Sequence, residues 1–278
     1  MGIMFAALSA VLYGTADFSG GLATRKSPTA AVLVTSQILG LVIALVAAPL
    51  LGWDRVTAGD LLWGALAGMT GAIGLGYLYR GIARGFVAVT APLAAVTGAA
   101  VPVIGGVLLG EAPGLLGWSG IAVSIPAIFL LAYEPGSRPD PVRMAESLKC
   151  GLVAGIAFGA FFILISRPSP AAGFWPIAAS RAASVLMVLS WIRLRRERIR
   201  IARESMPAVA VAGSFDTAAN ITFVLSAQLE LLPVVSVVSS LAPGPTVILG
   251  RVLLGEVLTA NRITGLLLAL VGVALLSL

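Results

Sequence analysis

Three charged residues lie inside stretches of the chain that are otherwise apolar: Asp17, Arg181 and Asp216. A charge at the centre of a membrane helix costs about 2.5–3.5 kcal/mol on insertion scales, so such residues face the protein interior and usually pair. Arg181 and Asp216 are expected near mid-depth of neighbouring helices, which favours an ion pair. A guanidinium attracts a carboxylate and a carboxylate attracts an ammonium group, so these charges suit a zwitterionic amino acid. The alternative is an ion pair that only joins two helices.

The composition indicates that the elements carrying these charges lie in a membrane. The chain is 59% hydrophobic and 11% charged, whereas soluble domains carry about 25% charged residues. It has no histidine and one cysteine, Cys150, which excludes His-based catalysis, Cys/His zinc sites and an intramolecular disulfide. We therefore expect no catalytic residues, no metal and no cofactor.

Ten apolar stretches are long enough to cross a bilayer, which takes roughly 17–25 residues each. Open sheets cannot satisfy their backbone groups in lipid, and the alternating polarity of a membrane barrel is absent, so the stretches are expected to be helices. No basic segment precedes the first stretch, which favours a retained helix over a signal peptide. The predicted spans are 3–22, 30–52, 60–79, 87–109, 115–133, 150–166, 174–192, 206–228, 232–250 and 260–278.

The chain repeats itself at about half its length. The string GGVLLGE of residues 105–111 returns as GRVLLGE at residues 250–256, 145 positions later, and the same offset pairs Gly14 with Gly159 and Gly120 with Gly265. This predicts two five-helix halves, 1–133 and 150–278, joined by a cytoplasmic linker, 134–149. An odd number of helices inverts the second half, and secondary transporters with inverted repeats bind solute between the halves. The expected fold is thus an all-α protein with ten membrane helices in two inverted repeats around a central cavity.

The repeated acidic residues, Glu111 and Glu256, each follow a glycine at the end of a predicted helix. A glycine closes a helix well, and a carboxylate at the start of the next one favours its N-terminal dipole. We interpret both residues as structural residues of turns.

Basic residues predict the orientation, because cytoplasmic loops carry an excess of Lys and Arg. The even-numbered loops carry only Arg55 and Arg167. We expect the odd-numbered loops to be cytoplasmic, at the inner membrane, and both termini to be periplasmic. The run of residues 193–203 is then an anchor at anionic headgroups rather than a nucleic-acid patch. The odd-numbered loops carry Arg25, Lys26, Arg80, Arg84, Arg138, Arg143, Lys149, Arg193, Arg195, Arg196, Arg198, Arg200, Arg203, Arg251 and Arg262.

Several polar and aromatic residues are candidates for the wall of the cavity. Asp216, Asn220 and Phe223 share one helix face because they are spaced by four and three residues. The offset of 145 residues makes Phe162 the equivalent of Asp17, so the two halves differ at this position. The alternative interpretation of Asp17 is a solvated carboxylate near a helix end. The expected substrate contacts are Tyr13, Asp17, Gln37, Tyr77, Tyr79, Arg181, Asp216, Asn220, Phe223 and Ser239.

Proline and glycine positions predict where helices bend and where they pack closely. Pro102, Pro243 and Pro245 lie in repeat-equivalent spans and each removes a backbone N–H. They are expected to form hinges or to free carbonyl groups towards the cavity; tolerated kinks are the alternative. Gly151, Gly155 and Gly159 form a ridge of small residues on the sixth span, and Gly64 and Gly68 start another on the third. Such ridges let membrane helices approach closely.

The paired Pro-containing helices, the two LLGE strings and the Gly-rich last helix of each half resemble the EamA-type transporters of the drug/metabolite transporter superfamily. The matching stretches are residues 102–120 and 245–265, with Arg181 early in the seventh span. The resemblance implies export of metabolites, amino acids or lipophilic compounds from a bacterial inner membrane, and the aromatic amino acid exporters are the most similar members. Members of the family are usually drawn with their termini inside, from which the charges here depart.

The functional hypothesis is therefore a secondary carrier that exports amino acids or related amphipathic metabolites by alternating access. A multidrug exporter of lipophilic cations is the alternative. A membrane-embedded enzyme lacks its motifs here, a channel lacks a continuous polar stripe, and no P-loop indicates ATP coupling. The expected partners are a small-molecule substrate and membrane lipid but no nucleic acid, with a monomer as one option for the assembly.

Overall fold

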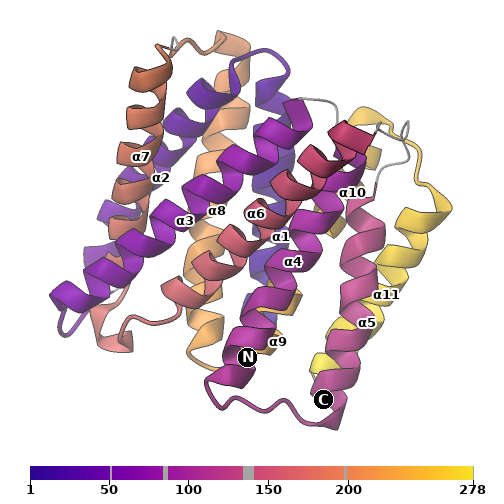
Figure 1. Cartoon of the computed structure of the whole chain (residues 1–278). Helices are drawn as coiled ribbons and strands as arrows, with labels where there is room; N and C mark the ends of the chain where they lie inside the picture. The colour runs from indigo at the N-terminus through magenta and orange to yellow at the C-terminus, as the bar shows by residue number, and fades with distance from the viewer. Residues whose placement is uncertain (51, 84–86, 134–140, 197–198, 278) are drawn as a thin grey trace.

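The computed structural model describes residues 1–50, 52–83, 87–133, 141–196 and 199–277, and these ranges contain helices and no strand (Figure 1). The all-α prediction is therefore confirmed for the described residues. The α-helices are α1 Gly2–Thr24, α2 Thr29–Leu50, α3 Ala58–Ala83, α4 Val87–Leu108, α5 Leu115–Ala132, α6 Pro141–Ile165, α7 Trp175–Arg195, α8 Met206–Ala227, α9 Leu232–Ser239, α10 Pro243–Leu254 and α11 Ala260–Leu276. Two short 3-10 turns, Pro170–Ala172 and Arg203–Ser205, precede α7 and α8.

Length and hydropathy identify these helices as membrane spans. Within the described residues, nine helical segments are long and apolar enough to cross a membrane, taking α9 and α10 together as one. The last helix, α11, is a shorter apolar helix of 17 residues. The expected set of ten apolar helices is thus present, and the chain is a multi-pass membrane protein.

The sequence predicts a single span, the ninth, for residues 232–250. In the structure this segment consists of two helices. Helix α9 ends at Ser239 and α10 starts at Pro243. Pro243 and Pro245 remove two backbone N–H groups within one turn, so the backbone tightens and Gly244 N–H donates to the Leu241 carbonyl instead (2.9 Å). In contrast α4, with its prolines ten positions apart at Pro92 and Pro102, is continuous.

The expected linker is shorter than residues 134–149. Helix α6 already begins at Pro141, so residues 141–149 are helical. Proline suits the first turn of a helix, where its missing N–H would have no intrahelical partner. Residues 134–140 lie outside the described residues.

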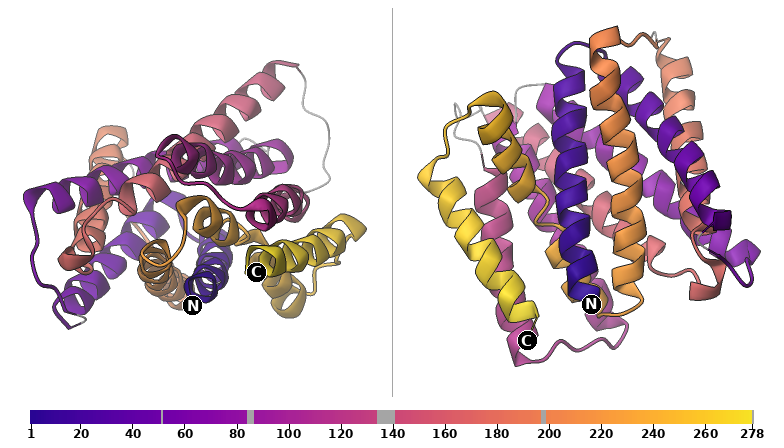
Figure 2. Two further views of the ribbon diagram at one scale, coloured as in Figure 1. Left: turned by 90° about the horizontal axis from the view of Figure 1, so that it is seen from below. Right: turned by 180° about the vertical axis from the view of Figure 1, so that it is seen from behind.

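Helices of the first half pack mainly on helices of the second. Helix α1 lies along α8, α3 along α6 and α7, α4 along α6, and α5 along α11 (Figures 1 and 2). The Ser9 hydroxyl donates to the Ala219 carbonyl (3.0 Å) across the α1–α8 contact. The core is therefore built between the two halves of the sequence.

Glycines set the closest of these contacts, as predicted. A Cβ added at Gly68 would lie 1.9 Å from the Ser180 carbonyl oxygen of α7, and one at Gly64 would lie 2.2 Å from that of Pro176. On α6, Cβ atoms at Gly155 and Gly159 would lie 2.5 Å from side chains of α4. Only glycine allows these backbones to approach so closely.

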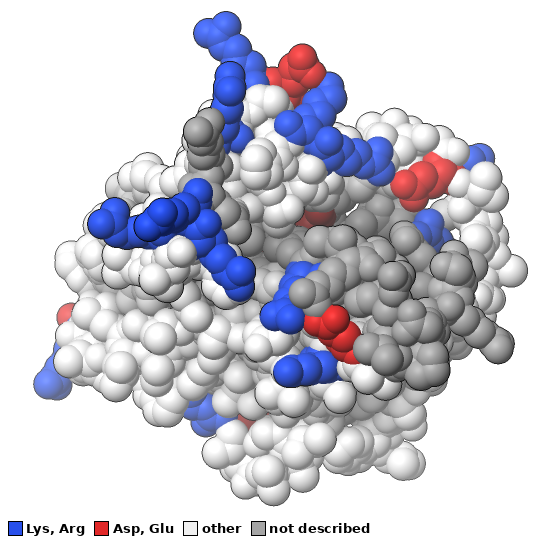
Figure 3. Space-filling model, turned by 45° about the horizontal axis from the view of Figure 1, so that its top comes forward, with Lys and Arg blue, Asp and Glu red and all other residues white. Residues whose placement is uncertain are grey.

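The two ends of the molecule differ in charge. Both termini lie at the lower end in Figure 1, α1 runs upward from it and α6 runs downward. Figure 3 looks onto the opposite, upper end, where Lys and Arg side chains gather. We call this upper end the basic face; it includes the end of α7 with Arg193 and Arg195, and the start of α11 with Arg262.

Candidate functional site

A cavity of about 450 Å³ lies among the helices of both halves. Its volume is within the roughly 300–1,000 Å³ typical of small-molecule sites. The lining residues reach Gly21, Leu78, Ala132 and Arg262, close to helix ends at the basic face. The described loops at the opposite end contribute none of the lining, so the cavity opens towards the basic face.

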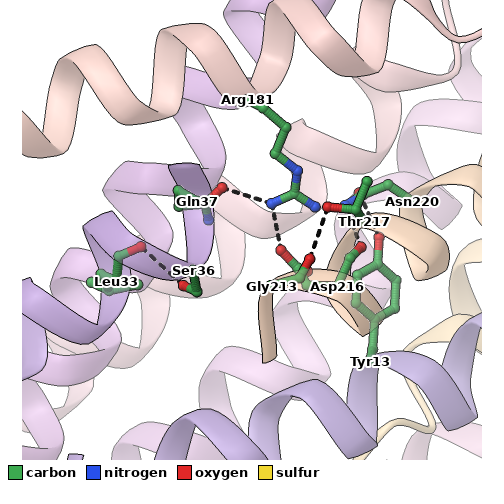
Figure 4. Close-up of polar contacts among 9 residues, drawn as sticks. All are labelled: Tyr13, Leu33, Ser36, Gln37, Arg181, Gly213, Asp216, Thr217 and Asn220. Atoms are coloured by element: carbon green, nitrogen blue, oxygen red, sulfur yellow. Dashed lines mark hydrogen bonds and ion pairs between the residues drawn. The ribbon is translucent and has the colours of Figure 1, made fainter. Parts of the chain in front are cut away.

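Arg181 is the central polar group of the cavity wall. Its side chain comes from α7 and bonds with one nitrogen, Nη1, to Gln37 Oε1 of α2 (2.7 Å) and to Asp216 Oδ2 of α8 (Figure 4). The expected ion pair with Asp216 is therefore present, and Gln37 joins it. Arg181 is only 5% exposed, and its Nη2 has no hydrogen-bond partner among the described residues. This nitrogen is a donor without a partner, and it is itself buried rather than exposed on the cavity surface.

Tyr13 and Asn220 extend the polar group towards α1. The Tyr13 hydroxyl donates to Asn220 Oδ1 (2.8 Å), and Asn220 Nδ2 donates to the Asp216 carbonyl one turn earlier on α8 (2.7 Å). Both lie on the cavity wall next to Arg181 (Figure 4). These bonds hold the tyrosine ring and the amide in place, which leaves a rigid polar wall.

Asp17 also lines the cavity, one helical turn beyond Tyr13 on α1. Its side chain is exposed and makes no hydrogen bond or ion pair with the described residues. The site thus holds one exposed carboxylate and one buried guanidinium nitrogen, and both lack a partner among the described residues.

The break between α9 and α10 forms another part of the wall. Ser239, Ser240 and Pro243 line the cavity. The Ser239 hydroxyl is buried and has no partner among the described residues. On α1, Gly14 lies directly against the break, since a Cβ there would be 2.3 Å from the Ala242 carbonyl oxygen, and Thr246 Oγ1 donates to the Gly14 carbonyl (2.8 Å).

Three phenylalanines of α6 form the apolar side: Phe158, Phe161 and Phe162. The Phe162 ring lies edge-on to Tyr13 with ring centres 6.1 Å apart and stacks on Phe223 at 4.5 Å. Phe223 itself is fully buried and does not line the cavity. It acts from behind the wall by supporting Phe162.

The remaining candidates lie elsewhere. Tyr77 is half-buried and outside the lining, while the side chain of Tyr79 lies outside the described residues. Pro102 and Pro245 are also outside the lining; Pro102 faces the glycine ridge of α6 near Gly159. Of the three prolines, the structure places Pro243 at the cavity.

Sequence reasoning missed several lining residues. Ser180 and Ser184 line the cavity on either side of Arg181 on α7. They are spaced by one helical turn, and this spacing next to an arginine within a span could have identified them from the sequence. Arg262, assigned to a loop, lies in the first turn of α11 and lines the cavity. The phenylalanines of α6 could not be predicted to line the cavity, because an aromatic residue in a membrane span serves helix packing as often as ligand binding.

Apolar helices long enough to cross a bilayer, with a cavity between them, define the class of multi-pass membrane proteins. Residues 147–278 match the model of the EamA-like transporter family. The match supports an EamA-type transporter of the drug/metabolite transporter superfamily, a family of membrane transporters.

The fold of the whole chain is similar to that of a solved structure titled "Crystal structure of protein". The two share 14% sequence identity over 99% of this chain and 96% of the other, with a TM-score of 0.80. At this identity the similarity shows the fold alone. No curated protein matches the sequence.

Proposed function

We propose that the chain is a secondary carrier that exports amino acids or related small amphipathic metabolites across the bacterial inner membrane. The observation that carries the proposal is two groups of opposite charge at one cavity that lack a partner among the described residues, the Nη2 atom of Arg181 and the Asp17 carboxylate. A zwitterion satisfies both at once, with its carboxylate on the guanidinium and its ammonium on the aspartate. Each of the two groups would favour a partner of opposite charge.

The apolar side of the cavity completes the substrate class. Phe158, Phe161 and Phe162 lie on α6, within the same cavity as the polar wall. An aromatic or large aliphatic side chain would pack against these rings, whereas a charged side chain would lose its hydration there. The proposed substrate is therefore a neutral amino acid with a large apolar side chain.

Alternating access follows from the proposed inverted repeat. The offset of 145 residues makes α6 the equivalent of α1, and α8 the equivalent of α3. The α1–α8 contact is therefore equivalent to the α6–α3 contact, and the structure contains both. The opposite directions of α1 and α6 in Figure 1 fit the same relation. Two halves that can exchange conformations would open the site to one side and then to the other.

A multidrug exporter of lipophilic cations is the second candidate. One observation favours it: Asp17 has no partner among the described residues, and aromatic rings line the same cavity, a combination that binds organic cations. In that case Arg181 would stay with Asp216 and serve only to join α7 and α8.

Uptake into proteoliposomes tests the proposal. The purified chain would be reconstituted into liposomes, and radiolabelled phenylalanine, leucine, glutamate or tetraphenylphosphonium would be added to the external buffer. Liposomes without protein are the control. We expect saturable uptake of phenylalanine and leucine that unlabelled phenylalanine inhibits. The analogues phenylpropionate, without the ammonium, and phenylethylamine, without the carboxylate, should inhibit about tenfold less well, because each loses one of the two charge-assisted contacts. Uptake of tetraphenylphosphonium alone would favour the multidrug function instead.

A further inference from the structure

The two copies of the repeated glutamate have different partners, although each follows a glycine of positive φ. Gly110 and Gly255 both adopt positive φ, at 90° and 69°. Glu111 N–H donates to the Gly106 carbonyl (3.0 Å), and Glu256 N–H donates to the Gly250 carbonyl (3.2 Å). Both helices therefore end near a glycine of positive φ, but the N–H of Glu111 bonds five residues back and that of Glu256 six, and the carboxylates also differ in their partners.

The Glu111 carboxylate reaches across to the other half of the chain. Its Oε2 accepts a hydrogen bond from the backbone N–H of Leu232 (2.6 Å), the first residue of α9. Beside it, a Cβ added at Gly106 would lie 2.6 Å from Pro233 Cδ, so α4 and α9 touch. A carboxylate on a free N–H at a helix N-terminus makes a charge-assisted bond, stronger than a neutral one. This contact joins the halves at the end where the cavity is closed.

The Glu256 carboxylate stays within its own half. Its Oε2 lies 3.5 Å from Arg262 Nη1, and its backbone carbonyl accepts from Arg251 Nη1 (3.3 Å). Arg262 lines the cavity near its opening. The end of the molecule that carries Glu256 is therefore the open one.

The repeat identifies the partner that Glu256 lacks in this state. The offset that carries Glu111 onto Glu256 carries Val87 onto Leu232. Val87 is the first described residue of α4, next to residues 84–86, which the structure does not describe, and Leu232 is the first residue of α9. The repeat therefore predicts that Val87 offers the N–H equivalent to that of Leu232. The same offset carries Gly106 onto Arg251 and Ala88 onto Pro233. The contact between Gly106 and Pro233 therefore corresponds to a contact between Arg251 and Ala88, and each combines a small residue with a larger one.

The cavity lining is asymmetric in the way that such an exchange requires. Ala91 of α4 lines the cavity, whereas its equivalent on α9, Ser236, is 0% exposed and lies outside it. Further along the same helices, Ala94 and Ser239 both line it. The segment of α9 next to the Leu232 cap is thus covered, while the matching segment of α4 is open.

We infer that Glu111 and Glu256 are the two gating residues of the transport cycle, each capping the first N–H of a helix in the opposite half in one state only. In the present state Glu111 holds Leu232 and the cavity opens at the basic face. In the opposite state Glu256 releases Arg262 and caps Val87, Glu111 releases Leu232, and the cavity opens at the other end. Exchanging one carboxylate cap for the other keeps the two states close in free energy, which an exchange between populated states needs. The inference rests on the inverted repeat of the proposed function but not on the identity of the substrate.

Two cysteine reporters at equivalent positions test the gate without any substrate. In purified full-length protein with Cys150→Ala, either Ala91→Cys or Ser236→Cys would be introduced, and the rate of reaction with a small hydrophilic maleimide measured. The Ala91→Cys thiol should react faster in the present state. Glu111→Ala should raise the rate at position 236 about tenfold relative to the rate at 91, and Glu256→Ala should lower it by a similar factor, since each change removes one charge-assisted bond. The double variant should return the ratio close to its starting value.

Controls separate gating from damage to the fold. Asp54→Ala removes an exposed carboxylate at the same end as Glu111, and its side chain makes no bond with the described residues, so the ratio should not change. Glu111→Gln and Glu256→Gln keep an acceptor and should give smaller shifts in the same directions if the alanine variants unfold. Shifts in the same direction for both glutamates, or none in any variant, would leave them as structural turn residues. Loss of phenylalanine uptake with normal gating would overturn the substrate and not the gate.

Discussion

At the level of single residues, the two acids of the cavity have different surroundings and should respond differently to neutralisation. Asp216 holds the buried guanidinium of Arg181, whereas Asp17 bonds to nothing among the described residues. Breaking a buried pair from one side costs about 3–5 kcal/mol because it leaves an uncompensated charge. A carboxylate without a partner contributes no such bond to the fold.

We therefore expect Asp17→Asn to keep the melting temperature within about 1 °C, while Asp216→Asn lowers it by several degrees. Asp17→Asn should also weaken phenylalanine binding about tenfold, because the ammonium loses its charged partner. Thermal unfolding in detergent and equilibrium binding of labelled phenylalanine measure the two effects. Equal losses of stability in both variants would mean that Asp17 is a structural residue.

The same comparison explains which site residues the sequence could identify. Charges within apolar spans stand out, so Asp17, Arg181 and Asp216 were predicted, and all three line the cavity. Phe223 shares a helix face with Asp216 but is buried behind Phe162. A helical period gives the face of a residue but not the depth at which a neighbouring helix covers it.

At the level of helices, close glycine contacts decide which helices can pair. Along α3, Gly68 meets the backbone of Ser180 on α7, whereas Gly76 has nothing within 4 Å of an added Cβ. The two glycines therefore form a matched pair on one helix, one at a close approach and one in open space.

Gly68→Val should separate α3 from α7 and destabilise the protein by about 3 kcal/mol or more, since the clash is with backbone that cannot rotate away. Gly76→Ala should be neutral or stabilising by roughly 0.5–1 kcal/mol, because alanine favours the helix. Thermal unfolding of both variants in the same detergent measures the difference. Similar losses in the two variants would contradict the packing described here.

The broken ninth span shows what local signals can and cannot give. Two prolines within one turn predicted a disturbance, and α9 indeed ends before Pro243. Pro102 gave the same local signal in the equivalent span, yet α4 continues through it. One missing N–H can be accommodated within a helix, whereas two in one turn cannot.

At the level of the whole molecule, the distribution of charge predicts the orientation in the membrane. The Lys and Arg side chains gather on the basic face, away from both termini (Figures 1 and 3). We propose that this face is cytoplasmic, as cytoplasmic loops carry the excess of basic residues. The open cavity would then face the cytoplasm, from which an exporter takes its substrate.

Single cysteines in a Cys150→Ala background test this orientation. Asp54 and Arg200 are both exposed, at opposite ends of the molecule. In intact cells, with the outer membrane permeabilised, a membrane-impermeant maleimide should label Asp54→Cys and not Arg200→Cys, and both should react after lysis. The reverse pattern would place the basic face and the open cavity in the periplasm.

The order of polar and apolar residues was sufficient to predict a multi-pass helical protein, its apolar spans, the close glycine contacts and a polar site around Arg181. Each membrane helix satisfies its own backbone hydrogen bonds, so its existence depends on local sequence alone. The tertiary structure decided which side chains share the cavity, the capping of α9 by Glu111 and the end at which the cavity opens. These features depend on how helices more than 100 residues apart rotate and pack against one another, and the pattern along one helix carries no information about its neighbour.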